Sequence, residues 1–133
     1  MENLLPSIFF KCNRFNSTVQ RDYFINPNSF GDDVGKWLRV ELEKVGFGVE
    51  GPDQEDWGWY LIVFDPGSSL SASVNIGLGG GNEQEAFQIF VSSKIGLISF
   101  ITGKSKVLLL HANKVKAAVD DILRNDSEIT LTD

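Results

Sequence analysis

The residues with the clearest chemical potential in this sequence are two pairs of carboxylates near two tryptophans. Asp32 and Asp33 precede an apolar stretch with helical spacing, and Glu55 and Asp56 lead into the segment Trp57–Trp59. If folding brings the two pairs together, the four carboxylates could hold a hard cation or act in acid–base catalysis. The alternatives are that the acids cap turns and the helix start, or that they belong to a binding surface.

The two tryptophans bear on the choice between these interpretations. Trp57 and Trp59 alternate, so both side chains would point to the same face of a β-strand. Gly58 between them would let another backbone approach the opposite face closely. Aromatic side chains ringed by charge are typical of protein–protein contacts, but tryptophans also pack inside cores, and the sequence leaves both interpretations open.

Other motifs do not complete a recognisable catalytic pattern. Gly103–Ser105 lacks the glycine that a phosphate-binding loop needs five residues earlier, where Ile98 stands. Gly77–Gly81 lacks a third dinucleotide-binding glycine, because the position holds Asn82. His111 is the single histidine and is expected on the surface near a helix start. These observations favour a protein without a bound cofactor.

Composition predicts one globular domain spanning residues 1–133, with 42% hydrophobic and 23% charged residues. Lys and Arg number 12 and Asp and Glu number 18, so the net charge is −6, which disfavours nucleic-acid binding. Cys12 is the only cysteine, which excludes an internal disulfide and a thiolate zinc site. Residues 1–6 show no basic, apolar leader, so we expect a cytoplasmic protein.

Charge is unevenly distributed along the chain. Residues 41–65 contain seven acids and one base, Lys44, whereas residues 94–116 contain five lysines and no acid. Two solvated faces would explain this pattern, and so would an acidic face that docks a basic partner. The apolar segment Ile95–Ile101 is too short to span a bilayer, although with its flanking lysines it could touch a membrane surface.

Apolar residues recur at helical spacing in two segments, Asp32–Val45 and Leu110–Arg124. Gly46 follows the first segment, as a left-handed C-cap requires. Strand patterns, with turns at 16–18 and 51–53, predict these segments: 7–14, 19–26, 57–64, 70–78, 86–91 and 128–132, with a further short strand at 47–50. The order β-β-α-β-β-β-α-β predicts an α+β fold, a mainly antiparallel sheet of five to seven strands with two helices on one face.

At several positions the sequence resembles a family of small, uncharacterised bacterial proteins with a Gly-Asp-Asp helix start and a Glu-Asp-Trp-Gly-Trp signature. The resemblance spans about residues 20–131 and rests on these positions: Phe30–Val34, Trp37–Leu38, Gly46, Pro52, Gln54–Tyr60, Gly96–Leu97, Gly103–Lys104, Asp126 and Ile129. Members often carry a tryptophan on the last strand, where this chain ends with Thr130–Asp133. The resemblance implies no particular reaction, and it directs attention to the carboxylates and tryptophans introduced above.

We therefore predict a non-enzymatic, cytoplasmic domain that binds another protein through an acidic and aromatic surface. The partner-binding residues would be Asp32, Asp33, Glu55, Asp56, Trp57 and Trp59. A role in toxin neutralisation or phage defence would suit a small acidic protein. The alternative is a carboxylate-based enzyme or divalent-metal binder that uses the same four acids. We expect no nucleic acid and no stable membrane insertion, and a homodimer is left open.

Overall fold

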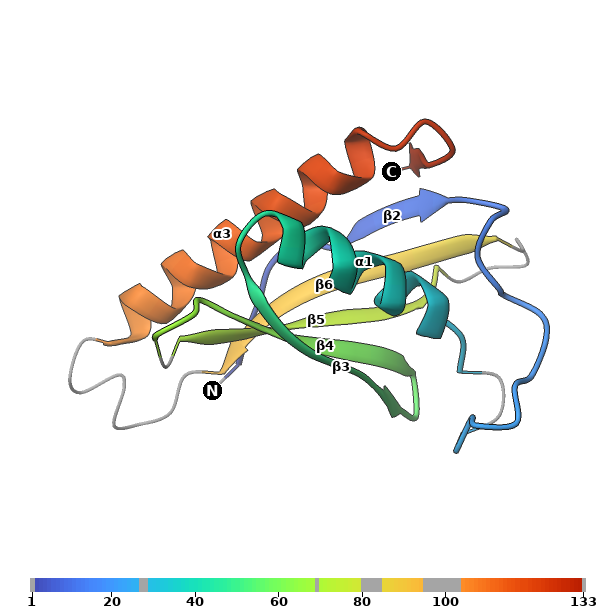
Figure 1. Ribbon diagram of the computed structural model, residues 1–133, viewed down its shortest axis with the longest axis horizontal. Coiled ribbons are helices and arrows are strands. Elements are labelled where there is room, and N and C mark those ends of the chain that lie inside the picture. Colours follow the sequence, from blue (N-terminus) through green and yellow to red (C-terminus); the bar gives the residue numbers. More distant parts are fainter. Residues whose placement is uncertain (1, 27–28, 69, 80–84, 95–103, 133) are drawn as a thin grey trace.

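The computed structural model describes residues 2–26, 29–68, 70–79, 85–94 and 104–132. Its elements are β1 (Glu2–Leu4), β2 (Ile8–Lys11), α1 (Asp32–Lys44), β3 (Gly48–Glu55), β4 (Gly58–Phe64), β5 (Ser71–Leu78), β6 (Ala86–Lys94), α3 (Lys104–Arg124) and β7 (Thr130–Thr132). The strands form one antiparallel sheet in the order β3-β4-β5-β6-β2-β7, and β1 also pairs with β6. Both helices lie on the same face (Figure 1), so the predicted α+β fold is confirmed.

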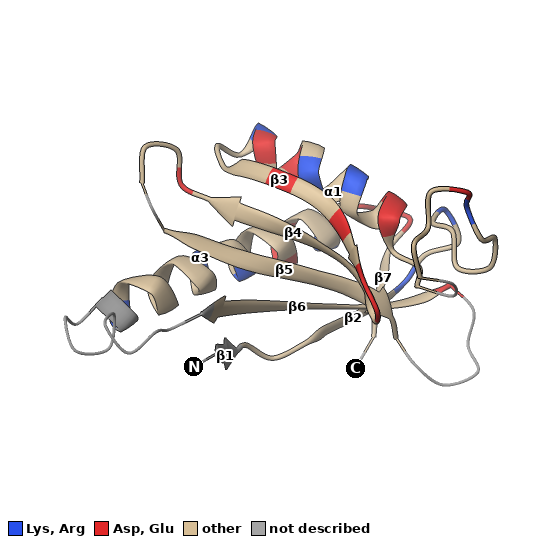
Figure 2. Cartoon of the chain, turned by 90° about the horizontal axis from the view of Figure 1, so that it is seen from below, with Lys and Arg blue, Asp and Glu red and all other residues tan. Residues whose placement is uncertain are grey.

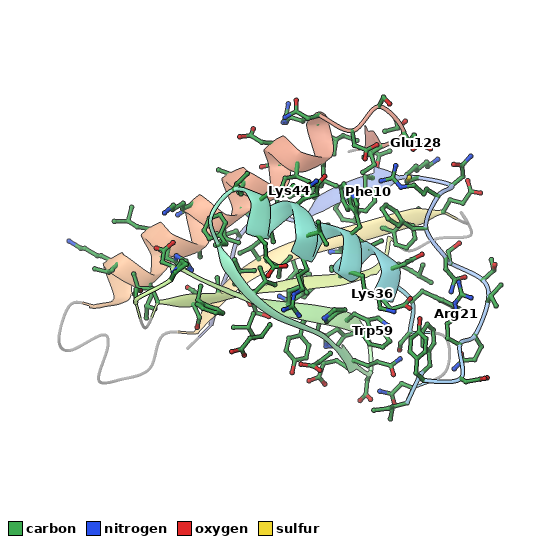
Figure 3. The ribbon with its side chains drawn as sticks, viewed as in Figure 1. Phe10, Arg21, Lys36, Lys44, Trp59 and Glu128 are labelled. Atoms are coloured by element: carbon green, nitrogen blue, oxygen red, sulfur yellow. The ribbon has the colours of Figure 1, made fainter. Side chains whose placement is uncertain are left out.

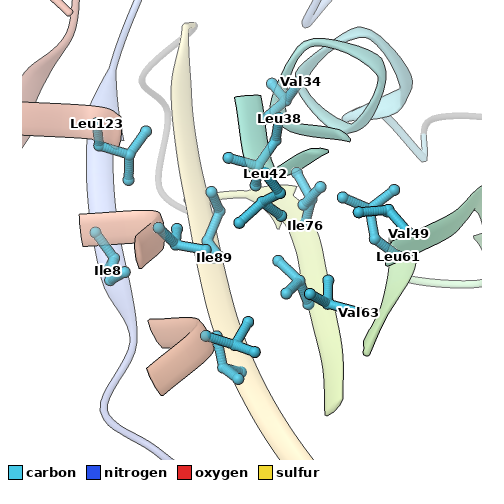
Figure 4. Close-up of a cluster of buried hydrophobic side chains, with 14 of the residues drawn as sticks. Ile8, Val34, Leu38, Leu42, Val49, Leu61, Val63, Ile76, Ile89 and Leu123 are labelled. Carbon is cyan, nitrogen blue, oxygen red and sulfur yellow. The ribbon is translucent and has the colours of Figure 1, made fainter. Parts of the chain in front are cut away.

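The hydrophobic core lies between the sheet and the two helices. One stripe of each helix and alternate residues of the strands are fully buried there (Figure 4): Val34, Leu38, Leu42, Leu61, Val63, Val74, Ile76, Ile89, Val91, Val115, Val119 and Leu123. Each such side chain contributes roughly 1.5–3 kcal/mol through its removal from water. Because alternate strand residues point to opposite faces, the remaining strand residues form a second face, which neither α1 nor α3 covers. We call it the open face.

The helix predictions agree with the structure at most of their ends. Helix α1 begins at Asp32 as expected and ends at Lys44. Gly46 follows with a φ of 102°, the left-handed conformation that a C-terminal cap requires. Helix α3 begins at Lys104, six residues before the predicted start, and ends at Arg124 as expected.

The predicted strand at 19–26 is wrong. The turn before it is present, since the Asn16 side chain accepts hydrogen bonds from the backbone N–H groups of Thr18 and Val19. Further along, the backbone N–H groups of Ile25 and Asn26 bond to the side-chain oxygen of Gln54, not to a neighbouring strand. A side chain of β3 therefore satisfies the polar backbone that a sheet partner would otherwise take, and the segment stays irregular.

The turn predicted at 51–53 is instead part of β3. The pairing of β3 with β4 shifts register between Glu50 and Asp53, which marks a bulge, and the peptide bond between Gly51 and Pro52 is cis. The Gly51 carbonyl accepts a hydrogen bond of 2.7 Å from Arg39 of α1. Turn-forming residues here bend a strand without ending it, as bulges allow.

The prediction that His111 lies on the surface is wrong. Because α3 starts early, His111 falls inside the helix on its sheet-facing side and is only 3% exposed. Its Nε2 donates to the Val63 carbonyl oxygen at 3.1 Å, and its Nδ1 lies 3.4 Å from a carboxylate oxygen of Asp65. His111 therefore ties α3 to the end of β4.

Some predictions fall on other parts of the chain. The segment Ile95–Ile101 and the position Gly103 lie outside the described residues, as do Gly80–Gly81 and Asn82. Within the described ranges, neither helix is long and apolar enough to cross a membrane.

Candidate functional site

The chain reverses between β3 and β4 in a two-residue turn. Glu55 pairs with Gly58, so Asp56 and Trp57 form the turn itself. A Cβ at Gly58 would lie 2.1 Å from the carbonyl oxygen of Ile76, so only glycine permits this approach of β4 to β5. Gly58 was expected to let another backbone approach the opposite face of the strand; the close approach observed is instead by the neighbouring strand β5 within the sheet.

Trp57 and Trp59 point to different faces of the sheet, which corrects the expectation that they share one. The alternation rule applies within a strand, but Trp57 stands in the turn before β4 begins. Trp59 faces the helices and is 6% exposed, whereas Trp57 is 46% exposed and packs against Phe90 of β6, with ring centroids 5.7 Å apart.

Trp59 is part of the fold and not of an accessible surface. It forms a small buried cluster with Phe24 and Phe30, and its indole N–H donates to the Ser29 carbonyl oxygen at 2.8 Å. Figure 3 shows Trp59 at the same end of the molecule as the first turns of α1, where Lys36 lies. Trp59 thus anchors the irregular segment that leads into α1.

Asp32 and Asp33 also hold this segment. Asp32 is 1% exposed and accepts a hydrogen bond from the Tyr23 hydroxyl, which raises the pKa of Tyr23. Asp33 accepts from the backbone N–H of Asn16 at 2.7 Å and from that of Val34 at 3.0 Å. Burial raises the pKa of Asp33, the two backbone hydrogen bonds oppose this, and the charge of Asp32 adds to the increase. The expected capping role is met only in part, because Gly31 is the N-cap.

The four carboxylates lie at one end of the molecule but do not form a common group. Ser29, three residues before Asp32, donates its hydroxyl to the Asp56 backbone carbonyl at 2.7 Å, so the two regions are in contact. The side chains diverge, since Asp32 is buried beside Tyr23 while Asp56 is exposed at the turn, as is Glu55. In the described part of the chain, no three His, Cys, Asp or Glu side chains are arranged to hold a metal ion.

Two predicted residues, Glu55 and Trp57, line a shallow cavity of about 350 Å³ on the open face. The other lining residues are Tyr60, Ser73 and Asn75. We call these five residues the hairpin pocket.

Asn75 gives the hairpin pocket a rigid floor. Asn75 is 6% exposed; its amide donates to the Phe90 carbonyl at 3.1 Å and to the Ser92 hydroxyl at 3.3 Å. Its side-chain oxygen accepts from the Ser73 hydroxyl at 2.9 Å. Because both ends of the amide are already bonded, the floor is fixed before any ligand arrives.

Sequence reasoning missed Tyr60 and Asn75. Tyr60 pairs directly with Asn75 across β4 and β5, so their side chains lie on the same face. Both occupy the alternate positions between the apolar residues of their strands. Once the turn at Asp56–Trp57 is known, that alternation would place them beside Trp57.

A larger cavity, of about 650 Å³, lies between α1 and α3 and includes Trp37, Phe47 and Ile122. Its rim is acidic, but most of that charge is neutralised within the chain by these pairs: Glu41 with Lys44, Asp65 with Lys114 and Asp126 with Arg14. Among the described residues, no such pair is formed by Glu55 or Asp56. The acidic charge at the larger cavity is therefore mostly paired, whereas the acidic charge at the hairpin pocket remains available to a ligand.

Comparison with models of protein families, with curated proteins and with solved structures gives no significant match. The family resemblance of the sequence therefore stays a prediction.

Proposed function

We propose that this chain is a non-enzymatic protein-binding domain whose contact surface is the β3–β4 turn together with the hairpin pocket. The observation that carries the proposal is Trp57, a large aromatic side chain that is 46% exposed and supported from behind by Phe90. Tryptophan is strongly enriched among the residues that dominate binding energy. A half-exposed tryptophan held in place pays little conformational entropy on binding.

The charge of this surface supports a basic partner. Glu55 and Asp56 directly precede Trp57 and are exposed, and the chain as a whole carries a net charge of −6. Opposite charge steers encounter and rejects acidic competitors. A two-fold symmetric homodimer through this surface would bring like charges together, so a different protein is the better partner.

The proposal narrows the set of contact residues predicted from the sequence. Glu55, Asp56 and Trp57 would contact the partner directly. Asp32, Asp33 and Trp59 would position the segment beneath them, because all three are bonded inside the fold. A basic toxin or phage protein would fit such a surface, in line with the small size and acidic charge of the chain.

The test uses the wild type and three single variants as immobilised baits in an extract of the native host. Trp57→Ala removes the aromatic contact and Glu55→Gln removes one charge; Asp121→Asn, on the exposed side of α3, is a control of equal charge change. Any protein retained by the wild type is purified and its affinity measured. We expect roughly thirtyfold weaker binding to Trp57→Ala, as for a hot-spot residue, and no change with Asp121→Asn. Equal affinity for Trp57→Ala would overturn the proposal.

A further inference from the structure

Arg14 is surrounded by aromatic rings and carboxylates at one edge of the sheet. Its guanidinium carbon lies 4.8 Å from the ring centre of Phe15 and 5.4 Å from that of Trp37. The same guanidinium bonds to Asp126 at 2.9 Å and to Glu128 at 2.7 Å. Ring faces attract cations and carboxylates neutralise them. We call such a group of rings, carboxylates and a cation a cation set; here the chain itself supplies every member.

Two lysines make simpler versions of the same set, each with one ring and one carboxylate. The ammonium groups lie 4.7 and 5.4 Å from the ring centres, in these combinations: Lys36 with Tyr23 and Asp32, and Lys114 with Phe47 and Asp65. In this protein, therefore, two rings with two carboxylates hold an arginine, and one ring with one carboxylate holds a lysine.

The hairpin pocket contains two rings and one carboxylate, an arrangement between the two just described, and none of its five described residues is basic. Trp57, Tyr60 and Glu55 line it together. The chain has no Lys or Arg from residue 45 to residue 93, which covers β3, β4, β5 and nearly all of β6. Figure 2 shows acidic segments along β3, with the neighbouring basic segments on α1. Arg39 of α1 is engaged elsewhere, by the Gly51 carbonyl and by Glu43.

We propose that a partner completes this set with an arginine side chain, whose guanidinium lies against Trp57 and Tyr60 and pairs with Glu55. The inference rests on the proposed function and names the group that this surface recognises. Arginine fits better than lysine because its planar guanidinium stacks on rings and can meet a carboxylate with two hydrogen bonds. The cavity of about 350 Å³ is large enough for an arginine side chain.

The test is an NMR titration of the wild-type protein with three probes: N-acetyl-arginine amide, N-acetyl-lysine amide and N-acetyl-citrulline amide, the last being uncharged and nearly isosteric with arginine. The signals followed are the three indole N–H resonances, assigned with Trp→Phe variants, and the Asn75 side-chain amide. We expect arginine to move the Trp57 and Asn75 signals saturably and to leave Trp59 unchanged. Lysine should act more weakly and citrulline least.

Variants separate the pocket from general attraction to an acidic protein. Glu55→Gln should weaken arginine binding roughly two- to fivefold, as expected for one exposed ion pair, and Asp121→Asn should leave it unchanged. Equal responses to arginine and citrulline, equal affinities for arginine and lysine, or equal effects of the two variants would each overturn the inference.

Failure of this inference is distinguishable from failure of the proposed function. If a purified partner depends on Trp57 but free arginine does not bind beside it, the surface binds proteins without an arginine contact. If arginine binds the pocket but no partner depends on Trp57, the pocket is real and the protein-binding proposal is wrong.

Discussion

The surroundings of Arg14 and the hairpin pocket lie towards opposite edges of the sheet and contain similar side chains. Beside Arg14, two rings and two carboxylates enclose a guanidinium that the chain itself supplies. In the hairpin pocket, Trp57 and Tyr60 stand next to Glu55 in a region where the sequence supplies no base. Because Arg14 belongs to the chain itself, it joins parts of the fold: the segment after β2, helix α1 and the segment before β7. Where the chain supplies no cation, we propose that a partner supplies it.

The largest expected effect is a difference in stability between variants of the two hairpin tryptophans. Trp59→Ala empties a buried site and leaves the Ser29 carbonyl with only its longer hydrogen bond, of 3.4 Å from Gln54, so it should lower the free energy of unfolding by about 3–5 kcal/mol. Trp57→Ala, on a half-exposed residue, should cost less than about 1 kcal/mol. Urea denaturation of both variants measures this. Similar losses would show that Trp57 belongs to the core.

The turn at Asp56–Trp57 depends on Gly58, which follows it. Gly58→Ala should cost about 2–3 kcal/mol, because the added Cβ would collide with the Ile76 carbonyl. Gly67→Ala is the control: Gly67 has a φ of 81° but open space around it, so its cost should be about 1 kcal/mol from backbone strain alone. Thermal and urea unfolding compare the two. A tolerated Gly58→Ala would contradict this turn geometry.

Removing a charge should affect stability in one region and not in the other. Arg14→Gln leaves Asp126 and Glu128 without their cation and should lower the free energy of unfolding by about 1 kcal/mol. Glu55→Gln should leave stability unchanged or slightly raised, because it relieves repulsion among neighbouring acids. Denaturant midpoints of both variants test this, and a larger loss for Glu55→Gln would reverse the assignment of the two regions.

The smallest expected effect is a pH dependence that belongs to the Arg14 site. The hydrogen bond from Arg14 lowers the pKa of Asp126 below its ordinary 3.8. A carboxylate with a lowered folded-state pKa stabilises the protein above the ordinary value and loses that contribution as pH falls through the folded pKa. The stability difference between wild type and Arg14→Gln, of about 1 kcal/mol or less, should therefore shrink below pH 3.8. An unchanged difference in acid-range denaturation curves would contradict this.

The sequence predicted the fold well where periodicity and burial agree. Burial determines the apolar stripes of α1 and of the second half of α3, and the alternation along β5. Each of these patterns is visible in the local sequence. The start of α3 was placed too late, and with it His111, because Lys104–Leu109 gave no clear apolar stripe to extend the helix.

The candidate site was predicted less well because it depends on tertiary contacts. The Gln54 side chain replaces a strand partner for residues 25–26. The close approach of the Ile76 carbonyl to Gly58 fixes the turn that sends Trp57 and Trp59 to different faces. Neither effect is visible in local spacing. Of the residues predicted from the sequence, Glu55 and Trp57 line the hairpin pocket, whereas the presence of Tyr60 and Asn75 beside them follows only from cross-strand register.

The most direct test of the central claim is an arginine titration of the Arg14→Gln variant, followed at the indole signals of Trp37 and Trp57. In the wild type, Arg14 already lies over Trp37, so only Trp57 should respond to N-acetyl-arginine amide. In the variant, both signals should respond, with affinities within roughly fivefold of each other, because both sets of rings and carboxylates then lack a cation. A response at Trp37 alone, or at neither tryptophan, would contradict the account.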